Sequence, residues 1–161
     1  MKRAATLPAC TLSTALLLTG CSYVTPTITQ EEATEKVQEH AQNTLAALPQ
    51  KAELEKRGGP GSPPCGNPSM LSEEDRVTVS EFFWIRGIPE EDNETTLELL
   101  HDHWDTNDYQ ILNDNRPNDP FINVENEEDS FQVAIEYNKY GDLALTVRSP
   151  CLWPDGTPEI F

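Results

Sequence analysis

A short apolar run near the amino terminus, ALLLTGC at residues 15 to 21, decides which part of this chain can fold into a domain. Seventeen residues separate Arg3 from Cys21, and several of them are Thr, Ser or Pro. A helix that crosses a bilayer needs about 20 predominantly apolar residues, so this run is too short to span one. Lys2 and Arg3 before the run, and small residues after it, are typical of a secretory signal that is removed. The folded part is therefore expected to begin after residue 20.

The four residues Leu18-Thr19-Gly20-Cys21 resemble the lipobox of bacterial lipoproteins. The resemblance implies a signal peptide over residues 1–20, cleaved before Cys21, and fatty acylation (palmitate or a similar chain) of the Cys21 sulfur. Two or three acyl chains hold a protein stably at a bilayer, because each buried methylene adds about 0.8 kcal/mol. The protein would then be anchored in the cell membrane through Cys21, on the extracytoplasmic face. An ordinary signal peptide with an incidental cysteine is the alternative.

The four cysteines predict one disulfide. Cys10 lies in the removed segment and Cys21 carries the lipid, which leaves Cys65 and Cys151 in a compartment where disulfides persist. In the chain-entropy model, a bridge that closes about 85 residues stabilises a fold by about 4 to 5 kcal/mol. Two buried free thiols or a zinc site are the alternatives, but no histidine pair at ligand spacing accompanies the two cysteines.

The charge of the chain limits its partners. The net charge is −17, and it becomes −19 when Lys2 and Arg3 are removed with the signal peptide. Such a protein repels nucleic acid and anionic lipid headgroups, so the anchor on Cys21 is expected to be its contact with the membrane. The remaining 141 residues suit one modest domain, expected to be a monomer.

The first half of the expected domain combines a spacer, a helix and a loop. Residues 21–28 are uncharged, contain a proline and suit an extended spacer, and the domain covers residues 29–161. Thr29 and Glu32 have the spacing of a capping box, and Pro49 is expected to end or kink the helix, with a short polar continuation at 50–57. Residues 58–64, GGPGSPP, predict an irregular loop. The helix is expected to pack one apolar stripe on the domain, with a free stalk as the alternative: Ala33, Val37, Ala41, Leu45 and Leu48.

The second half is dominated by strand patterns. We expect strands at 77–86, 109–112, 121–124, 131–137 and 143–147, of which the last two form a hairpin with Gly141 in its turn. A helical stripe follows the acidic residues 90–94 and includes Leu97, Leu100 and Trp104, with Asn107 as its left-handed cap. This order predicts an α+β fold: an antiparallel sheet of four to five strands, helices packed on one face, and one disulfide.

The carboxyl-terminal segment SPCLWPDGTPEIF carries a second resemblance. It resembles the closing segment of small secreted cell-envelope lipoproteins of actinobacteria, including the LppA-like lipoproteins of mycobacteria. The acidic first helix and the Gly/Pro loop also resemble the corresponding parts of these lipoproteins. The resemblance brings no catalytic residue and no cofactor with it.

Two polar clusters are candidates for ion binding. His101 and His103 in HDHWD point away from each other on a helix, so with Asp105 they form a two-ligand site at most, and no metal site is predicted. A half-buried His101 and a solvated His103 are the favoured alternative. The Asn/Asp-rich stretch 113–120 offers oxygens for calcium but lacks the glycine and closing glutamate of an EF-hand loop. His40 falls at a polar position of the first helix.

The sequence therefore predicts a membrane-anchored, non-enzymatic lipoprotein that presents a binding surface to an envelope protein or a wall component. A carrier of an apolar ligand or lipid is the main alternative, and a metal-dependent hydrolase around His101, His103 and Asp105 is a weaker one. No catalytic residue is predicted. The candidate aromatic cleft for a ligand comprises Phe82, Phe83, Trp84, Trp104 and Trp153.

Overall fold

The computed structural model describes residues 27–65 and 76–157. Residues 1–20, Cys21 and most of the expected spacer 21–28 lie outside the described residues. Six strands form one antiparallel sheet in the order β1-β2-β6-β5-β4-β3, together with two α-helices and a short 3₁₀ turn, η1. Their bounds are α1 Gln30–Ala46, β1 Glu53–Lys56, β2 Ser80–Arg86, η1 Glu90–Asp92, α2 Asn93–Asp105, β3 Tyr109–Asp114, β4 Phe121–Asn126, β5 Gln132–Tyr137 and β6 Leu143–Arg148.

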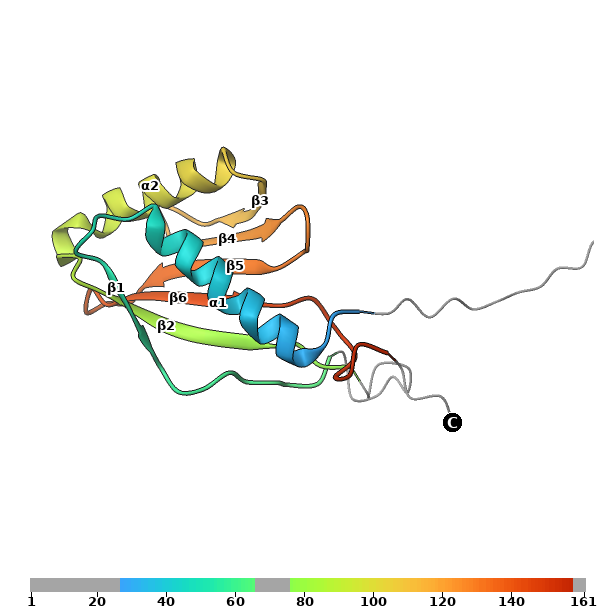
Figure 1. The fold of residues 1–161 in the computed structure, drawn as a ribbon. Helices are drawn as coiled ribbons and strands as arrows, with labels where there is room; N and C mark the ends of the chain where they lie inside the picture. The colour runs from blue at the N-terminus through green and yellow to red at the C-terminus, as the bar shows by residue number, and fades with distance from the viewer. Residues whose placement is uncertain (1–26, 66–75, 158–161) are drawn as a thin grey trace, which may run out of the picture.

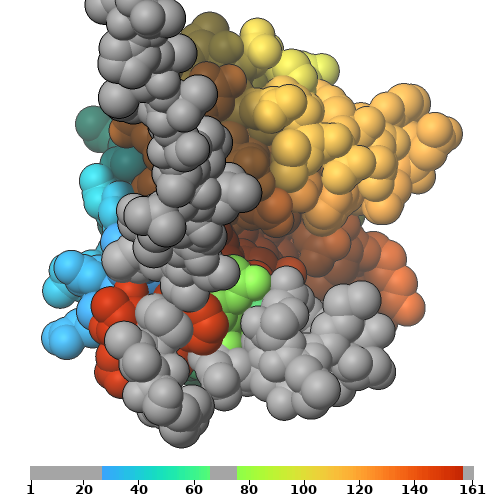
Figure 2. All heavy atoms as spheres, turned by 90° about the vertical axis from the view of Figure 1, so that its right-hand side faces the viewer, coloured from blue at the N-terminus to red at the C-terminus, as the bar shows by residue number. Residues whose placement is uncertain are grey.

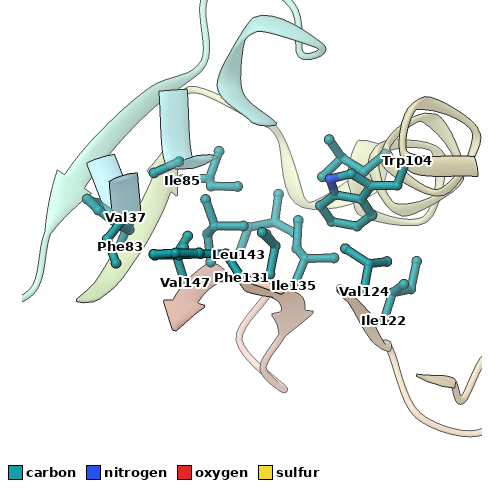
Figure 3. Packing of buried hydrophobic residues seen from close by; sticks show 14 of the residues in the cluster. Val37, Phe83, Ile85, Trp104, Ile122, Val124, Phe131, Ile135, Leu143 and Val147 are labelled. Carbon is teal, nitrogen blue, oxygen red and sulfur yellow. The ribbon is translucent and has the colours of Figure 1, made fainter. Parts of the chain in front are cut away.

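Both helices pack on the same face of the sheet. Helix α1 crosses in front of β6 and β2, and α2 lies along the side of β3 and β4 (Figure 1). Val37 of α1 and Trp104 of α2, both fully buried, contact one apolar cluster supplied by alternate residues of the strands (Figure 3). We call this helix-covered side the covered face. Its strand residues are Phe83, Ile85, Ile122, Val124, Val133, Ile135, Leu143, Leu145 and Val147.

Helix α1 begins where the sequence predicts it. The Thr29 hydroxyl accepts a hydrogen bond from the Glu32 amide at 3.2 Å, and the Glu32 carboxylate accepts one from the Thr29 amide at 2.7 Å. This capping box satisfies two backbone N–H groups that the first turn leaves without helical partners. The stripe residues Ala33, Val37 and Ala41 are fully buried, so α1 packs on the domain and is not a free stalk.

The predicted sheet of four to five strands is wrong by one strand at its edge. Residues 53–56 form β1, which pairs with β2, although the sequence predicts no strand within the polar segment QKAELEKR. Only Leu54 of β1 is apolar, because an edge strand buries little of its surface. Lys56 of β1 forms an ion pair with the buried Glu81 of β2, with Nζ and Oε1 3.0 Å apart.

The backbone before β1 comes very close to a glycine that follows β2. Gly87 follows β2 with φ +81°, and a Cβ atom there would overlap the backbone carbonyl of Lys51. Only glycine combines this backbone conformation with so close an approach of a second chain. The segment before β1 therefore packs directly on the backbone that follows β2.

The connections on the other side of the sheet follow the sequence more closely. The hairpin of β5 and β6 is confirmed, and Gly141 in its turn has φ +78°. The left-handed residue after α2 is Asp108, with φ 57°, and not Asn107 as expected. Asn107 instead donates its side-chain amide to the carbonyl of His103 at 2.7 Å.

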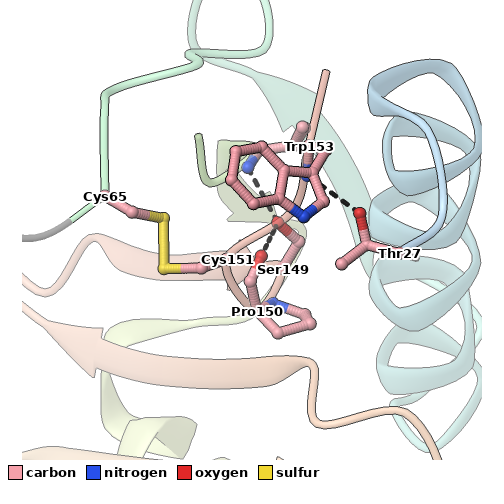
Figure 4. Close-up of a disulfide and its surroundings, with 7 residues drawn as sticks. Thr27, Cys65, Ser149, Pro150, Cys151 and Trp153 are labelled. Carbon is pink, nitrogen blue, oxygen red and sulfur yellow. Dashed lines mark hydrogen bonds between the residues drawn. A yellow bond between two sulfur atoms is a disulfide. The ribbon is translucent and has the colours of Figure 1, made fainter. Parts of the chain in front are cut away.

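A disulfide joins Cys65 and Cys151, as predicted, with their Cα atoms 6.0 Å apart. It links the loop before β2 to the segment after β6. Trp153 lies between this disulfide and Thr27, and its amide donates to the Thr27 hydroxyl at 2.8 Å (Figure 4). The start of α1 and the carboxyl-terminal segment therefore lie side by side at one end of the sheet (Figure 2).

Candidate binding sites

The five aromatic residues of the predicted cleft lie in three different places. Phe83 and Trp104 are buried in the core of the covered face. Phe82 and Trp84 alternate with Phe83 along β2 and therefore point to the opposite side of the sheet. Trp153 lies beside the disulfide. The structure brings Phe82 and Trp84 together, with ring centroids 5.1 Å apart in an edge-to-face arrangement, and does not join them to the other three.

The side of the sheet opposite the helices, which we call the open face, has a hollow centre. Opposite Phe82 and Trp84 of β2, strand β6 places Thr146 and Ala144, and β5 places Ala134 next to Thr146. These residues are small. The row that begins with Trp84 and Ala144 continues with Glu136 of β5 and Phe121 of β4, so Ala144 and the exposed Glu136 lie between the two aromatic residues. This aromatic trough includes a hollow of about 260 Å³, lined by Phe121, Asn123, Gln132, Ala134, Thr146 and Arg148.

Arginines accompany the aromatic residues of the trough. The Arg57 guanidinium lies 5.3 Å from the ring centroids of both Phe82 and Trp84, and that of Arg86 lies 5.3 Å from Trp84. Arg86 also donates to Glu55 at 2.7 Å and to Asp142 at 3.1 Å, and the hydrogen bond to Glu55 raises its pKa. Cation–π contacts of this kind hold arginine side chains flat over the rings. Arg57 is exposed, and no ion pair within the described residues involves it.

The metal candidates do not gather into one site. The ring of His101 lies 3.8 Å from Asp114 and 3.5 Å from Asp102, whereas His103 faces Asn107 at 3.4 Å. Asp105 is exposed at the end of α2. Among residues 27–65 and 76–157, no three His, Cys, Asp or Glu side chains are grouped closely enough to hold a metal ion.

In the Asn/Asp-rich stretch 113–120, the candidate for calcium binding, the carboxylate of Asp114 already has a partner. Arg116 donates to Asp114 through Nε at 2.9 Å and through a terminal nitrogen at 2.6 Å. The side-chain hydrogen bond from Arg116 lowers the pKa of Asp114. Residues 115–120 of the stretch form the connection between β3 and β4, in which the Asn118 and Asp119 amides donate to the Asn115 carbonyl. These residues act as turn formers.

A polar groove that the sequence did not indicate lies between α1, the end of α2 and the β4–β5 turn. We call it the His40 groove, and its volume is about 420 Å³. His40 is 6% exposed and stacks on Phe131 at 5.0 Å, so it occupies a buried position of α1 and not the polar one expected. The only sequence signal was its spacing, three residues after the buried Val37. The other lining residues are Lys36, Glu39, Asn43, Ala46, His103, Asn107, Asp108, Tyr109, Asn126, Glu128 and Asp129.

Two elements other than α1 supply the hydrogen-bond partners of His40. Its Nδ1 lies 2.7 Å from the Tyr109 hydroxyl at the start of β3, and its Nε2 lies 3.2 Å from Asp129 in the β4–β5 turn. If Nε2 carries the proton, it donates to Asp129, and the Tyr109 hydroxyl donates to Nδ1. Lys36 donates to the same carboxylate oxygen of Asp129 at 2.8 Å. The four side chains thus form one connected polar network.

The network shifts the pKa of three of its members. Burial alone would raise the pKa of the Asp129 carboxyl, but the hydrogen bonds and charges of Lys36 and His40 outweigh it, and the pKa is lowered. The hydrogen bond to Asp129 raises the pKa of Lys36. Burial, with the nearby charge of Asp129, raises the pKa of Tyr109 to about 12. At neutral pH, Asp129 is therefore ionised, Lys36 is charged and Tyr109 is a neutral phenol.

Comparison of the chain with protein families, curated proteins and solved structures finds no match in any of the three. Within the described residues, neither helix has the length and apolar character needed to cross a bilayer. The function of the protein is therefore inferred from the geometry of the domain and from its sequence.

Proposed function

We propose that this protein is a lipid-anchored binding module, attached to the membrane through Cys21, whose open face binds an envelope protein. The observation that carries the proposal is the aromatic trough: half-buried aromatic side chains with arginines over them, on the one face of the sheet that no described element covers. Sheets of this size normally bury both faces or make the second one uniformly polar. The open face is neither buried nor uniformly polar, and such a surface is suited to binding a partner protein.

The composition of the trough favours a protein as its partner. Tryptophan and arginine are the residue types that most often dominate the binding energy of protein interfaces, because they combine a large apolar surface with polar contacts. Here Trp84 is paired with Arg57 and Arg86. The small residues Ala134 and Thr146 line the hollow together with Phe121 and leave room there for a side chain of the partner.

The charge of the open face also supports a protein partner. The domain as a whole is strongly acidic, but three of its five arginines, Arg57, Arg86 and Arg148, belong to strands or edges of this face. Arg86 is paired with Glu55 of the same face, at 2.7 Å. A surface that carries both signs of charge reduces the repulsion that the rest of the domain exerts on acidic neighbours.

The alternative functions receive less support. The aromatic residues expected to enclose an apolar ligand are divided between the core, the open face and the disulfide region. The groups expected for a metal-dependent hydrolase contact different neighbours. Both functions stay weaker hypotheses than the binding module.

Site-specific photo-crosslinking in intact cells tests the proposal. A photoreactive amino acid replaces Thr146 in the trough or, as a control, the exposed Glu98 on the outer side of α2, in the full chain with its anchor. We expect Thr146 to crosslink one envelope protein and Glu98 not to. The product must be lost in Trp84→Ala and kept in Tyr140→Ala, which removes an aromatic residue that is 72% exposed on the β5–β6 turn.

Two results would reject the proposal. Crosslinking from Thr146 only to a second copy of this chain would make the open face a self-association surface. Equal crosslinking from Thr146 and Glu98 would mean that the trough has no special partner. The anchor is tested separately, because labelled palmitate should enter the full-length protein and should not enter the Cys21→Ser variant.

A further inference from the structure

We infer that the His40 groove binds a neutral polyhydroxylated ligand, of the chemical class of an uncharged oligosaccharide. This site is separate from the aromatic trough: it lies on the helix side of the sheet, at the junction of α1, the end of α2 and the β4–β5 turn. Its volume of about 420 Å³ falls within the range of about 300 to 1,000 Å³ that is common for small-ligand sites.

The floor of the groove is a fixed polar network. His40 is almost fully buried, yet its two ring nitrogens reach Tyr109 and Asp129 from two other elements. An apolar side chain at this position would pack on Phe131 without the cost of burying an imidazole. The network therefore does more than fill space, because it holds a phenol and a carboxylate at fixed positions where a ligand can reach them.

The charge at the floor of the groove is compensated, and the rim disfavours anions. Lys36 at 2.8 Å and His40 at 3.2 Å already contact the carboxylate of Asp129. An ammonium group could reach Asp129 only by displacing Lys36, so the rim carboxylates alone could attract one. The exposed rim carboxylates of Glu39, Asp108 and Glu128 repel phosphate and sulfate groups. Hydrogen bonding to a neutral molecule meets neither obstacle.

The rim supplies both donors and acceptors. Side-chain amides of Asn43, Asn107 and Asn126 line the groove, and each amide group carries two donor hydrogens and an acceptor oxygen. Asn107 donates to the His103 carbonyl at 2.7 Å, and Asn126 accepts from the Glu128 and Asp129 amides and donates to the Asp108 carbonyl at 3.3 Å, so both amides are held in place and keep only part of their hydrogen-bonding capacity for a ligand. Vicinal hydroxyls of a sugar can donate to carboxylates and accept from amides at the same time. An apolar ligand could satisfy none of these groups.

Titration of the folded, ¹⁵N-labelled protein with cellobiose and maltose tests the inference by NMR. We expect one or both sugars to shift the amides of Asn43, Asn107 and Glu128 with a Kd on the order of 1 to 10 mM, typical of a few hydrogen bonds. Tyr109→Phe removes only the hydroxyl that contacts His40, and it should weaken binding about tenfold.

Matched variants separate loss of the site from loss of the fold. Asn43→Ala removes an exposed rim amide and should weaken binding severalfold, whereas Gln42→Ala, an exposed neighbour on α1 outside the groove, should leave the Kd unchanged. Tyr140→Phe is the control for Tyr109→Phe. No shifts in the groove at about 50 mM of either sugar would overturn the inference. It would also be overturned if spermidine or inorganic phosphate shifted these amides and the sugars did not.

Discussion

The two faces of the sheet are built from the same six strands, yet the two helices cover one face and not the other. On the covered face, Phe83 and its apolar neighbours are closed off by α1 and α2. On the open face, Phe82 and Trp84 lie at the surface among small and charged residues. The difference shows that local hydrophobicity does not decide burial in a strand. What decides it is which side of the sheet the helices occupy, because the side chains alternate with period two.

The largest expected effect contrasts one residue type on the two faces. Trp104→Ala should lower the free energy of unfolding by about 3 to 5 kcal/mol, because it leaves a cavity under α2. Trp84→Ala should lower it by less than about 1 kcal/mol, because the ring is half exposed. Urea denaturation followed by circular dichroism measures both values. Equal losses for the two variants would mean that the open face is as much a core as the covered one.

The disulfide is expected to support both faces, because it ties the ends of the central strands β2 and β6. The double variant Cys65→Ser/Cys151→Ser should lose about 2 to 5 kcal/mol of stability. Reduction of the unaltered protein with dithiothreitol serves as the control and should lower the urea midpoint to a similar value. A double variant as stable as the parent would show that the sheet holds its ends without the bridge.

The pKa of Tyr109 provides a smaller test of packing beside the covered face. Burial raises its pKa from 10 to about 12, so the folded state keeps the phenolic proton that the unfolded chain loses. Its contribution to stability is thus complete below pH 10 and is lost as the pH rises towards about 12. The partly buried ring limits the effect to about 1 to 2 kcal/mol.

Tyrosine absorbance near 295 nm reports this titration directly. Tyr109→Phe should remove a late-titrating group and flatten the fall in stability above pH 10, whereas Tyr140→Phe should change neither. If Tyr109 titrates together with an ordinary exposed tyrosine, the hydroxyl is not enclosed in the way the His40 groove requires.

The smallest expected effect concerns the cap of α1, the helix that closes the covered face. Thr29→Ala removes the hydroxyl that accepts from the Glu32 amide and should cost about 1 kcal/mol. Thr95→Ala, at an exposed position of α2, should change stability by less than about 0.5 kcal/mol. A thermal melt of the three proteins compares them. A cost for Thr95→Ala as large as that for Thr29→Ala would argue against a specific role of the cap.

Features that depend on local chemistry could be predicted from the sequence. The capping box of Thr29 and Glu32, the β5–β6 hairpin with Gly141, and the Cys65–Cys151 pair are each fixed by residue types at short range or by elimination. The α+β class followed from the order of these elements. The one missed strand, β1, is polar and lies at an edge, where burial leaves little pattern in the sequence.

Features that depend on tertiary contact could not be predicted. The run Phe82-Phe83-Trp84 is aromatic throughout, so its alternation between the two faces leaves no trace in hydropathy. His40 is polar by composition, and its burial depends on Tyr109 and Asp129, which lie 69 and 89 residues away along the chain. The candidate sites therefore emerged from the arrangement of the elements and not from a motif.

The side-by-side position of the chain entry and exit has a mechanical consequence. A pull transmitted through the chain ahead of Thr27 meets the backbone bond from the Thr27 amide to the Gly156 carbonyl and the bond from Gln30 to Pro154. Behind those bonds, the Cys65–Cys151 bridge passes tension to β2 and β6 together. If the protein is anchored ahead of Thr27, as we propose, a pull on the chain would load this corner of the domain first.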